Sequence, residues 1–413
     1  MKWWFKQQLY VKIFICIIVG AILGFTLGDT ATAVLKPIGD VFIRLLKMLI
    51  VPVIFFTVVS GITKMEDVKS LRSVGGKLIV YYVITSLLAA VIGLVMALII
   101  KPGSVSVTGL IAETAKVEIN EFNIVETLIS WVPTNPFEAF VNANVLQILF
   151  FSVIFGMSLL LLREKVKKLN EVLDQCAEAM IKVTDIVMQF SPYGILALIA
   201  TMVNSLSLGT LAEVGKFILA DYLAIIIILL VVYPLQLKFS KINPIKFYKA
   251  ASPAVIIAAS TTSSAATLPV SLNVAEKSLK IPEKIYGFGL TVGATINTNG
   301  MAAAIGVIGV FACNIYDVPI TIPMMFQIIF LGLMLSMGAA GVKGAGIVLS
   351  ATLLQTLGLP LELVSIFAAI WPVIDIAHTT ANVVGDLVGV SIIASNAGEM
   401  NVDEFNKSVI TNA

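Results

Sequence analysis

Charged side chains are scarce in this chain of 413 residues, and histidine is nearly absent. Only 13% of the residues are Asp, Glu, Lys or Arg, whereas 58% are hydrophobic and a single histidine, His378, is present. The mean hydropathy is +1.00. Soluble domains carry about 25% charged residues, so this composition excludes a soluble globular protein. The net charge of +2, without a basic run, gives no reason to expect a nucleic-acid partner.

Cysteines and catalytic motifs are sparse as well. Cys16, Cys176 and Cys313 are scattered in or beside apolar segments, so buried thiols are expected rather than a disulfide or metal site. The sequence has no Walker loop, no pair of histidines for a metal and no nucleophile elbow. We therefore expect neither an enzyme nor an organic cofactor, and the missing ATP site argues against a primary pump.

Apolar runs of about 20 residues, the length that crosses a bilayer, recur along the chain. The expected spans are 10–27, 34–62, 77–100, an interrupted region 124–162, 183–205 and 217–237. A β-barrel would show short alternating strands instead. The sequence therefore predicts an all-α, multi-pass membrane protein. Residues 1–6 resemble a signal peptide, but no clean cleavage site follows them, so a retained first helix is expected.

Basic residues gather in alternate connections between the expected spans. These residues are Lys2, Lys6, Lys12, then Lys64, Lys69, Arg72, then Arg163, Lys165, Lys167, Lys168, and finally Lys238, Lys241, Lys246, Lys249. The segment 113–121 is mostly acidic. The positive-inside rule then predicts that both termini are cytoplasmic. The location is the cell membrane, which is the inner membrane if the source is a Gram-negative bacterium.

Two apolar segments near the C-terminus are interrupted by small and hydroxylated residues. The segment 250–272 contains the run 259–269, rich in Ser and Thr, and 333–357 contains the Gly-rich run 336–346. Lipid cannot satisfy the backbone groups of such runs. Each segment therefore predicts a re-entrant hairpin of two half-helices, followed by a span with polar residues in its middle. This unit occurs twice, which indicates inverted repeats with a transporter binding site near the bilayer midplane.

The last span, which contains Trp371 to Asp386, carries several polar residues on one helical face. Asp375, Asn382 and Asp386 fall within about one quadrant at about 100° per residue. A lone carboxylate in lipid costs about 2.5–3.5 kcal/mol on insertion scales, so these groups need polar or cationic partners. Asp386 and Asn382 offer oxygen ligands for a cation, although a hydrogen-bonded packing network is the alternative.

Asp375 and His378 lie one turn apart on the same helix and leave more than one interpretation open. Asp375 could hold an ammonium group or form a structural ion pair with a lysine. His378 could line a pocket or serve only in packing. At the first hairpin tip, the N–H groups near Ser263 and Ser264 would suit a carboxylate. Lys343, at the second tip, is expected to face solvent.

Four motifs together resemble the glutamate transporter homologue family, the dicarboxylate/amino acid:cation symporters. The motifs are Ser263-Ser264-Ala-Ala-Thr-Leu-Pro269, Gly293-Ala-Thr-Ile-Asn297, Gly341-Val-Lys-Gly-Ala-Gly346 and Asn382-Val-Val-Gly-Asp-Leu387. The resemblance covers nearly the whole chain. It implies eight transmembrane helices plus two re-entrant hairpins, arranged in a homotrimer. Transport would proceed by an elevator movement in which the second hairpin is the gate.

The resemblance also implies a division of the chain. Residues 1–245 would form mainly scaffold and trimerisation helices, with the third span, within 73–101, joining the transport core. Residues 246–395 would form the transport domain, and 396–413 a cytoplasmic tail. The parts of the transport domain are hairpin 1 at 246–278, span 7 at 283–312, hairpin 2 at 320–357 and span 8 at 361–395.

The resemblance assigns the following roles by position. Asp375 would bind the substrate amino group, and Asn382 would bind the α-carboxylate with Thr379 and the hairpin tip at Ser264. The substrate-binding residues would be Ser263, Ser264, Met301, Val342, Gly344, Gly346, Asp375, His378, Thr379 and Asn382. The ligands of the coupled Na⁺ would be Gly293, Asn297, Asn382 and Asp386 at one site, Thr295, Thr298, Ser336, Met337 and Ala339 at a second, and Tyr82, Thr85, Ser86, Asn297 and Asn299 at a third.

The sequence departs from the family pattern where the side chain of a substrate would lie. Asn299 replaces an acidic sodium ligand, which leaves the number of coupled ions open, and Met301 replaces a threonine that contacts an acidic side chain. His378 occupies the position of the arginine that binds the side-chain carboxylate. Thr262 and Trp371 stand where another arginine and a supporting acidic residue occur. The bidentate carboxylate clamp is absent.

These departures favour a sodium-coupled symporter for a neutral or otherwise non-dicarboxylate amino acid. One alternative is an acidic amino acid or dicarboxylate symporter that uses protonated His378. That alternative requires affinity to strengthen as the pH falls through the range near about 6.5. Alternatives from a different class are a channel and a ligand-binding sensor.

Overall fold

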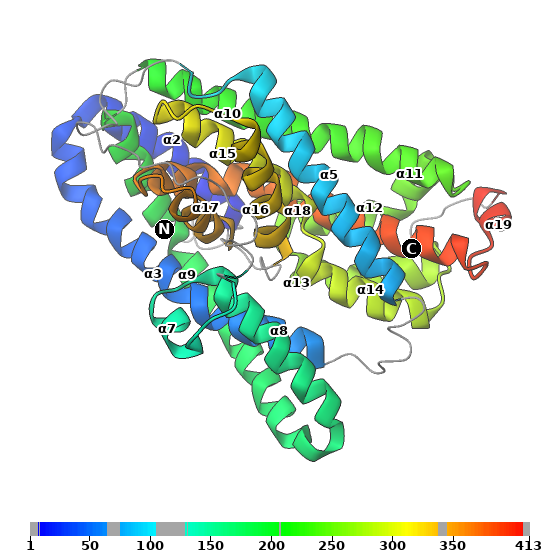
Figure 1. Cartoon of the computed structure of the whole chain (residues 1–413). Helices are drawn as coiled ribbons and strands as arrows, with labels where there is room; N and C mark the ends of the chain where they lie inside the picture. The colour runs from blue at the N-terminus through cyan, green and yellow to red at the C-terminus, as the bar shows by residue number, and fades with distance from the viewer. Residues whose placement is uncertain are drawn as a thin grey trace.

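The computed structural model describes residues 7, 9–63, 75–104, 129, 131–205, 208–337 and 345–407. Within these ranges every regular element is a helix, which confirms the predicted all-α class (Figure 1). Five stretches of described helix are long and apolar enough to cross a membrane, and five shorter apolar helices accompany them. These lengths and compositions do not test the number of eight membrane helices, the two re-entrant hairpins or the trimer. All three stay predictions.

The described helices form an almost continuous series along the chain. They are α2 (Leu9–Leu27), α3 (Asp29–Thr63), α5 (Gly76–Ile100), α7 (Pro136–Val141), α8 (Val145–Leu162), η2 (Arg163–Val166), α9 (Lys167–Ser205), α10 (Leu208–Ile227), η3 (Ile228–Val232), α11 (Tyr233–Phe239), α12 (Pro244–Thr261), α13 (Ser264–Asn273), η4 (Val274–Ser278), α14 (Glu283–Ile296), α15 (Asn299–Ile315), α16 (Ile322–Met337), α17 (Ala345–Thr356), α18 (Leu363–Asn396) and α19 (Val402–Lys407).

Two expected spans differ from the observed helices in extent. The span expected at 183–205 is the second half of α9, whose first half is also helical but more polar. The span expected at 217–237 includes a π-helical turn, η3, between α10 and α11. Periodicity and hydropathy find the part of a helix that lipid touches, and they miss its polar continuation.

The first interrupted segment contains a break between two helices, and another break divides the polar span that follows it. The helix α12 ends where Thr262 adopts a left-handed conformation with φ 49°, and Ser263 caps α13 by accepting a hydrogen bond from Ala266 N at 3.2 Å. The second break separates α14 from α15 at Asn297 and Thr298. Helices α12 and α13 pack on each other. The segment between α16 and α17, residues 338–344, lies outside the described residues.

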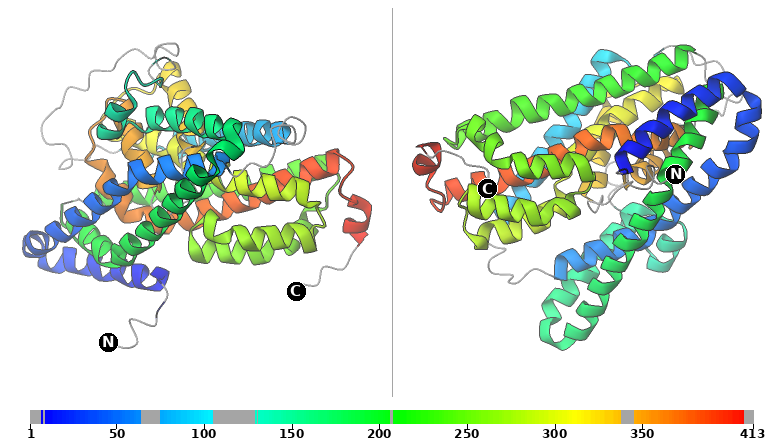
Figure 2. Two further views of the ribbon diagram at one scale, coloured as in Figure 1. Left: turned by 90° about the horizontal axis from the view of Figure 1, so that it is seen from below. Right: turned by 180° about the vertical axis from the view of Figure 1, so that it is seen from behind.

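The helices form two groups. Helices α2, α3, α8 and α9 pack mainly on one another, whereas α18 packs against α10, α12, α14, α15 and α17 and also touches α9. Figure 2 shows the orange-to-red α18 running beside the yellow-green helices α12 to α14 in both views. The described residues of α15 and α18 are mostly buried, and α5 exposes apolar side chains such as Ile84 and Ile99. The polar span α18 is therefore in the protein interior, away from the lipid-facing surface.

The C-terminal helix α19 lies against the basic turn before α12. Asn406 accepts a hydrogen bond from Asn243 N and donates to Lys241 O at 2.9 and 2.8 Å. Lys280 forms an exposed ion pair with Glu404, and this hydrogen bond and charge lower the pKa of Glu404. The cationic turn and α19 thus lie at the same end of the protein.

Small residues bring α5 and α15 into close contact. A Cβ atom on Gly93 would lie 2.0 Å from Ala303 O, and one on Gly306 would lie 2.6 Å from Ala90 O. Figure 1 shows the cyan α5 crossing the yellow α15 and α16. Small residues allow membrane helices to pack backbone against backbone. This contact holds α5, with Tyr82, Thr85 and Ser86, against the broken helix.

We expect Gly93→Ala to destabilise the protein by about 1–3 kcal/mol, because the added methyl group cannot fit against the Ala303 carbonyl without moving a helix. Thermal unfolding in detergent measures the effect. Gly215→Ala is the control, since a Cβ there has no atom within 4 Å. Equal midpoints for the two variants would show that the α5–α15 contact is not tight.

Candidate functional site

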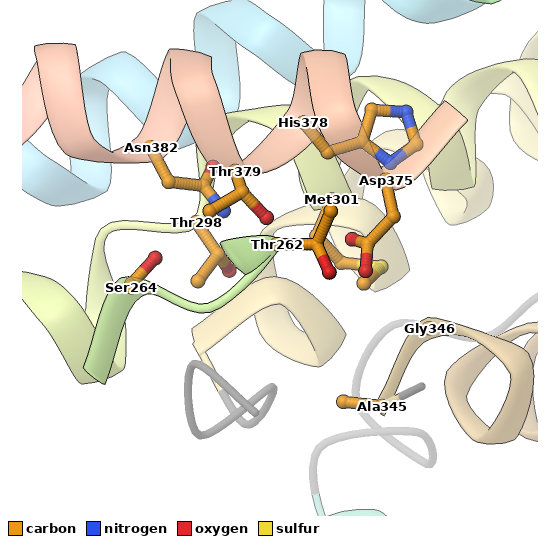
Figure 3. Close-up of a pocket in the computed structure, with 10 residues that line it drawn as sticks. All are labelled: Thr262, Ser264, Thr298, Met301, Ala345, Gly346, Asp375, His378, Thr379 and Asn382. Atoms are coloured by element: carbon orange, nitrogen blue, oxygen red, sulfur yellow. The ribbon is translucent and has the colours of Figure 1, made fainter. Parts of the chain in front are cut away.

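One pocket lies where the two helix breaks meet the middle of α18 (Figure 3). It is lined by Thr262, Ser264, Thr298, Met301, Ala345, Gly346, Asp375, His378, Thr379 and Asn382. Seven of the ten substrate-binding residues expected from the sequence are among them: Ser264, Met301, Gly346, Asp375, His378, Thr379 and Asn382. Ser263 caps α13 and is not part of the lining. Val342 and Gly344 lie outside the described residues, as do Ala339 and Lys343.

The close approach of α15 to α18 depends on a glycine. A Cβ atom on Gly300 would lie 2.4 Å from the Cα atom of His378. Because α15 begins at this point, Gly300 N has no earlier turn to bond to, and it donates to Asn382 Oδ1 at 2.8 Å. This contact directs the amide nitrogen of Asn382 away from Gly300. The first turn of α15 and the polar face of α18 are thereby fixed together.

The carboxylate of Asp386 lies on the other side of the same break between α14 and α15. Its Oδ1 accepts a hydrogen bond from Asn297 Nδ2 at 2.8 Å, and Asn297 Oδ1 accepts one from Thr85 Oγ1 at 3.3 Å. A Cβ atom on Gly293 would lie 2.5 Å from Asp386 Oδ1 and 2.9 Å from the hydroxyl of Tyr82. The structure therefore brings together most of the first and third expected cation sets. Asp386 is only 3% exposed.

The amide of Asn299 is held by neutral groups on both sides. Ser86 Oγ donates to Asn299 Oδ1 at 3.0 Å, and Asn299 Nδ2 donates to the hydroxyl of Tyr233 at 2.8 Å. That hydroxyl in turn donates to Ala381 O at 2.9 Å. The chain of hydrogen bonds links α5, α11, α15 and α18. It contains no charged group, so the position that the family fills with an acid contributes no charge here.

The second expected cation set is only partly assembled among the described residues. Thr298 Oγ1 donates to the carbonyl of Ser336 near the C-terminal end of α16, where the helix dipole places negative partial charge. Thr295 and Met337 line a separate apolar cavity of about 300 Å³ between α3, α5, α8, α14 and α16. The set thus divides between the end of α16 and this cavity.

The available donors suit a hard monovalent cation. Among the described residues no group of three His, Cys, Asp or Glu side chains lies close enough to hold a metal ion. Any cation near Asp386 would have one carboxylate, with amide, hydroxyl and carbonyl oxygens as its other ligands. Such an oxygen set fits Na⁺ and does not fit zinc or another metal that prefers nitrogen or sulfur.

His378 forms a buried pair with Asp221 of α10. Its Nε2 lies 2.9 and 2.8 Å from the two carboxylate oxygens, and the side chains are 1% and 0% exposed. Its Nδ1 is buried and has no hydrogen-bond partner among the described residues. In Figure 3 the ring edge that carries Nδ1 faces the side of the pocket where Asp375 and Met301 lie. The two ring nitrogens therefore have different surroundings.

Trp371 packs beside this pair. The centroids of its ring and the His378 ring are 5.5 Å apart, and a Cβ atom on Gly346 would lie 1.7 Å from the indole. The indole Nε1 is also buried without a hydrogen-bond partner among the described residues. Gly346 lines the pocket, so Trp371 forms a wall directly behind it.

Sequence reasoning missed Asp221. It is the only charged residue between 217 and 237, which is otherwise an apolar span. The rule that singled out Asp375 and Asp386, a lone carboxylate in a membrane helix, applies equally to Asp221. What the sequence could not supply was its partner, which lies 157 positions away.

Comparison with known proteins gives matches over nearly the whole chain. The profile of the sodium:dicarboxylate symporter family matches residues 9–396. A proton/sodium-glutamate symport protein of Bacillus caldotenax is 31% identical over 96% of this chain and 95% of its own length. A C4-dicarboxylate transport protein of Geobacter sp. (strain M21) is 31% identical over 98% and 93%. A proton/sodium-glutamate symport protein of Bacillus subtilis (strain 168) is 29% identical over 96% and 94%.

We expect Tyr233→Phe to destabilise the protein by about 0.6–1.7 kcal/mol, because it removes the hydroxyl to which Asn299 donates. Thermal unfolding in detergent provides the measurement. Tyr286→Phe is the matched control, because Tyr286 is also a buried tyrosine and its hydroxyl makes no hydrogen bond among the described residues. If the two variants unfold at the same temperature, the hydrogen-bond chain through Asn299 does not stabilise the bundle.

Proposed function

The chain belongs to the sodium:dicarboxylate symporter family, and on that premise we propose that it is a cation-coupled symporter of an acidic amino acid. The family consists of membrane transporters rather than enzymes, which fixes the class of activity. The relatives are named for glutamate and for C4-dicarboxylates. These names favour the acidic alternative over the neutral amino acid that the altered pocket residues suggested. The expectation of a neutral substrate therefore becomes the second candidate.

The observation that carries the proposal is that one pocket contains both Asp375, which can pair with an ammonium group, and His378, which can donate to a carboxylate. A dicarboxylate without an amino group would bring two negative charges to a pocket that already contains Asp375. An amino acid brings an ammonium group that can pair with Asp375, and the pairing compensates the cost of burying that carboxylate. The substrate is therefore proposed to be an amino acid rather than a plain C4-dicarboxylate.

His378 is proposed to bind the side-chain carboxylate of the substrate. In the protonated ring, Nε2–H donates to Asp221 and Nδ1–H is left to donate to a ligand. A hydrogen bond between an imidazolium and a carboxylate is charge-assisted, which makes it roughly twice as strong as a neutral one. The buried Nδ1, which has no hydrogen-bond partner in the part of the chain that the structure describes, supports this role. A single N–H of this kind replaces the two-pronged contact that an arginine would make.

The α-carboxylate is proposed to bind between α13 and α18. The N-terminus of α13 begins at Ser264, and its N–H groups favour an anion. Asn382, whose Oδ1 accepts from Gly300 N, has its amide nitrogen left to donate. Thr379 lies between Asp375 and Asn382 on the same face of α18. The three anchors of an acidic amino acid would then occupy successive turns of one helix.

We propose Na⁺ as the coupled ion at Asp386, with oxygens of Asn297 and Asn382 and the Gly293 backbone. Thr298 and the Ser336 carbonyl support a second cation position at the end of α16. At the third position Asn299 carries no charge, and its neutral partners support a weak site or none. The protein would therefore couple fewer sodium ions than a relative with an acid at this position.

The movement is proposed to be that of an elevator within a homotrimer. Residues 246–395 would move as the transport domain together with α5 and α10, which pack on α15 and α18, against a scaffold from α2, α3, α8 and α9. The packing of α2, α3, α8 and α9 mainly on one another supports such a division. The location is a membrane, and the proposed orientation has both termini in the cytoplasm.

A neutral amino acid is the second candidate, and Met301 is the observation that favours it, because it adds an apolar wall to the pocket. In a neutral ring with Nε2–H, Nδ1 is an acceptor. It could then accept a hydrogen bond from a side-chain hydroxyl or amide.

The pH dependence of uptake distinguishes the two candidates. A carboxylate side chain binds the imidazolium form, which becomes more populated as the pH falls, so affinity for glutamate or aspartate should rise by up to about tenfold per pH unit. It should level off once the ring is fully protonated. Competition for sodium-driven uptake in proteoliposomes between pH 5.5 and 8.5 measures this, with serine and glutamine as neutral competitors. If a neutral amino acid outcompetes both acids at every pH, the acidic assignment is wrong.

Asp386→Asn tests the cation site. The substitution removes the only carboxylate of the proposed ligand set, so we expect sodium-driven uptake to be lost. The stabilisation of the purified protein by NaCl relative to choline chloride should be lost as well, since a bound ion stabilises the folded state. Asp403→Asn, at an exposed residue of α19, is the control. Sodium stabilisation that survives in Asp386→Asn would contradict the assignment.

A further inference from the structure

The carboxylate of Asp221 is fully buried on α10 and has no part in the expected ligand sets. We propose that Asp221 is a positioning residue that determines substrate specificity: it binds Nε2 of His378, turns Nδ1 toward the pocket and supplies the counter-charge for a protonated ring. This proposal rests on the acidic amino acid substrate proposed above.

The geometry fixes the orientation of the ring. Both carboxylate oxygens lie within 2.9 Å of Nε2. A half-turn of the ring would exchange Nε2 with a carbon atom, and Asp221 would then lose its hydrogen bond. The ring edge that carries Nδ1 is therefore held toward the pocket, as in Figure 3. An ionised Asp221 accepts and cannot donate, so the proton on Nε2 is fixed and only Nδ1 is free to change.

The charges that act on the His378 ring come from Asp221 on α10 and Asp375 on α18. The described residues of α15 and α17, which also pack on α18, include no Asp, Glu, Lys, Arg or His. Trp371 packs against the His378 ring and is itself only 2% exposed, so bulk water does not solvate the imidazole. A buried imidazolium needs a counter-charge from the protein, and Asp221 is in contact with it.

A purely structural role does not account for Asp221. Two other hydrogen bonds already tie this part of the chain to α18, from the hydroxyl of Tyr222 to Val373 O at 2.7 Å and from that of Tyr233 to Ala381 O. A buried ion pair is a poor source of stability, because desolvation of the two charges offsets much of their attraction. An apolar residue would join the two helices at less cost. The pair therefore needs a role that only a carboxylate supplies.

The test compares Asp221→Asn with the wild-type protein in sodium-driven uptake. Competition by aspartate and glutamate is measured against competition by asparagine and glutamine across pH. We expect the variant to lose about tenfold or more in affinity for the acids and to stay within about threefold for the amides. Acid binding should also require a lower pH. Asp221→Glu should recover part of the affinity for the acids.

Glu213→Gln is the matched control. Glu213 is another buried carboxylate on α10, and it accepts from Gly103 N at 2.7 Å and pairs with Lys216. Its loss should lower stability without changing the ratio of acid to amide affinity. If Asp221→Asn weakens acids and amides equally, as a structural residue would, or if the ratio does not change, the proposal is overturned.

A measurement on the wild-type protein avoids dependence on a variant that fails to fold. His378 is the only histidine in the chain, so tag-free protein labelled with ¹⁵N-histidine gives one imidazole. We expect Nε2 to be protonated throughout and Nδ1 to become protonated when glutamate and Na⁺ bind. A ring with hydrogen on Nδ1 alone would overturn the proposed orientation. Wild-type uptake that prefers neutral amino acids would instead overturn the proposed substrate, and the role of Asp221 with it.

Discussion

Polar groups inside an apolar helical bundle must find partners within the protein, and the architecture around α18 depends on that constraint. The breaks at Thr262 and Asn297 leave backbone groups without partners in a helix. At the α14–α15 break, the side chain of Asn382 accepts a hydrogen bond from Gly300 N, and the Asn297 amide donates one to the Asp386 carboxylate. Small residues make this possible, because Gly93, Gly300 and Gly306 let backbones approach where any side chain would collide. The irregular backbone therefore depends on the close packing, because only closely packed helices bring polar partners to the breaks.

The sequence predicts local features well and pairings poorly, for a physical reason. Interrupted apolar runs predict the break between α12 and α13, because Ser and Thr in place of aliphatic residues are visible within a few positions. The polar face of α18 follows from the helical repeat. Asp221 shows the limit: its partner, His378, is 157 positions away and only packing brings them together. The same holds for the hydrogen bonds that link Ser86, Asn299 and Tyr233, because no sequence periodicity predicts them. The replacements at Thr262, Met301, Trp371 and His378 together favour a neutral substrate, whereas the pairing of His378 with Asp221 supplies the counter-charge that an imidazolium requires.

Exchanging a guanidinium for an imidazole changes the nature of a binding site. An arginine is charged at every physiological pH and binds a carboxylate with two N–H groups. An imidazole has one N–H left after the other is used, and its charge depends on pH. Asp221 compensates for the smaller number of N–H groups. It binds Nε2 and so fixes the ring with Nδ1 facing the pocket. The second difference remains, and it makes the affinity for an acidic substrate sensitive to protons in a way that an arginine would not.

On the proposed assignment, substrate and cation are coupled through the start of α15. Asn382 binds Gly300 N on one side and, one turn further along α18, Asp386 binds Asn297 on the other side of the same break. A cation that draws in the oxygens of Asp386 and Asn297 must also fix the break, and with it the position of Gly300 and Asn382. A substrate carboxylate that binds Asn382 needs that same position. Each ligand therefore supplies part of the ordering that the other requires, and by linkage the preference is mutual. Coupling of this kind needs no contact between substrate and ion, only a short unwound segment that both hold in one conformation.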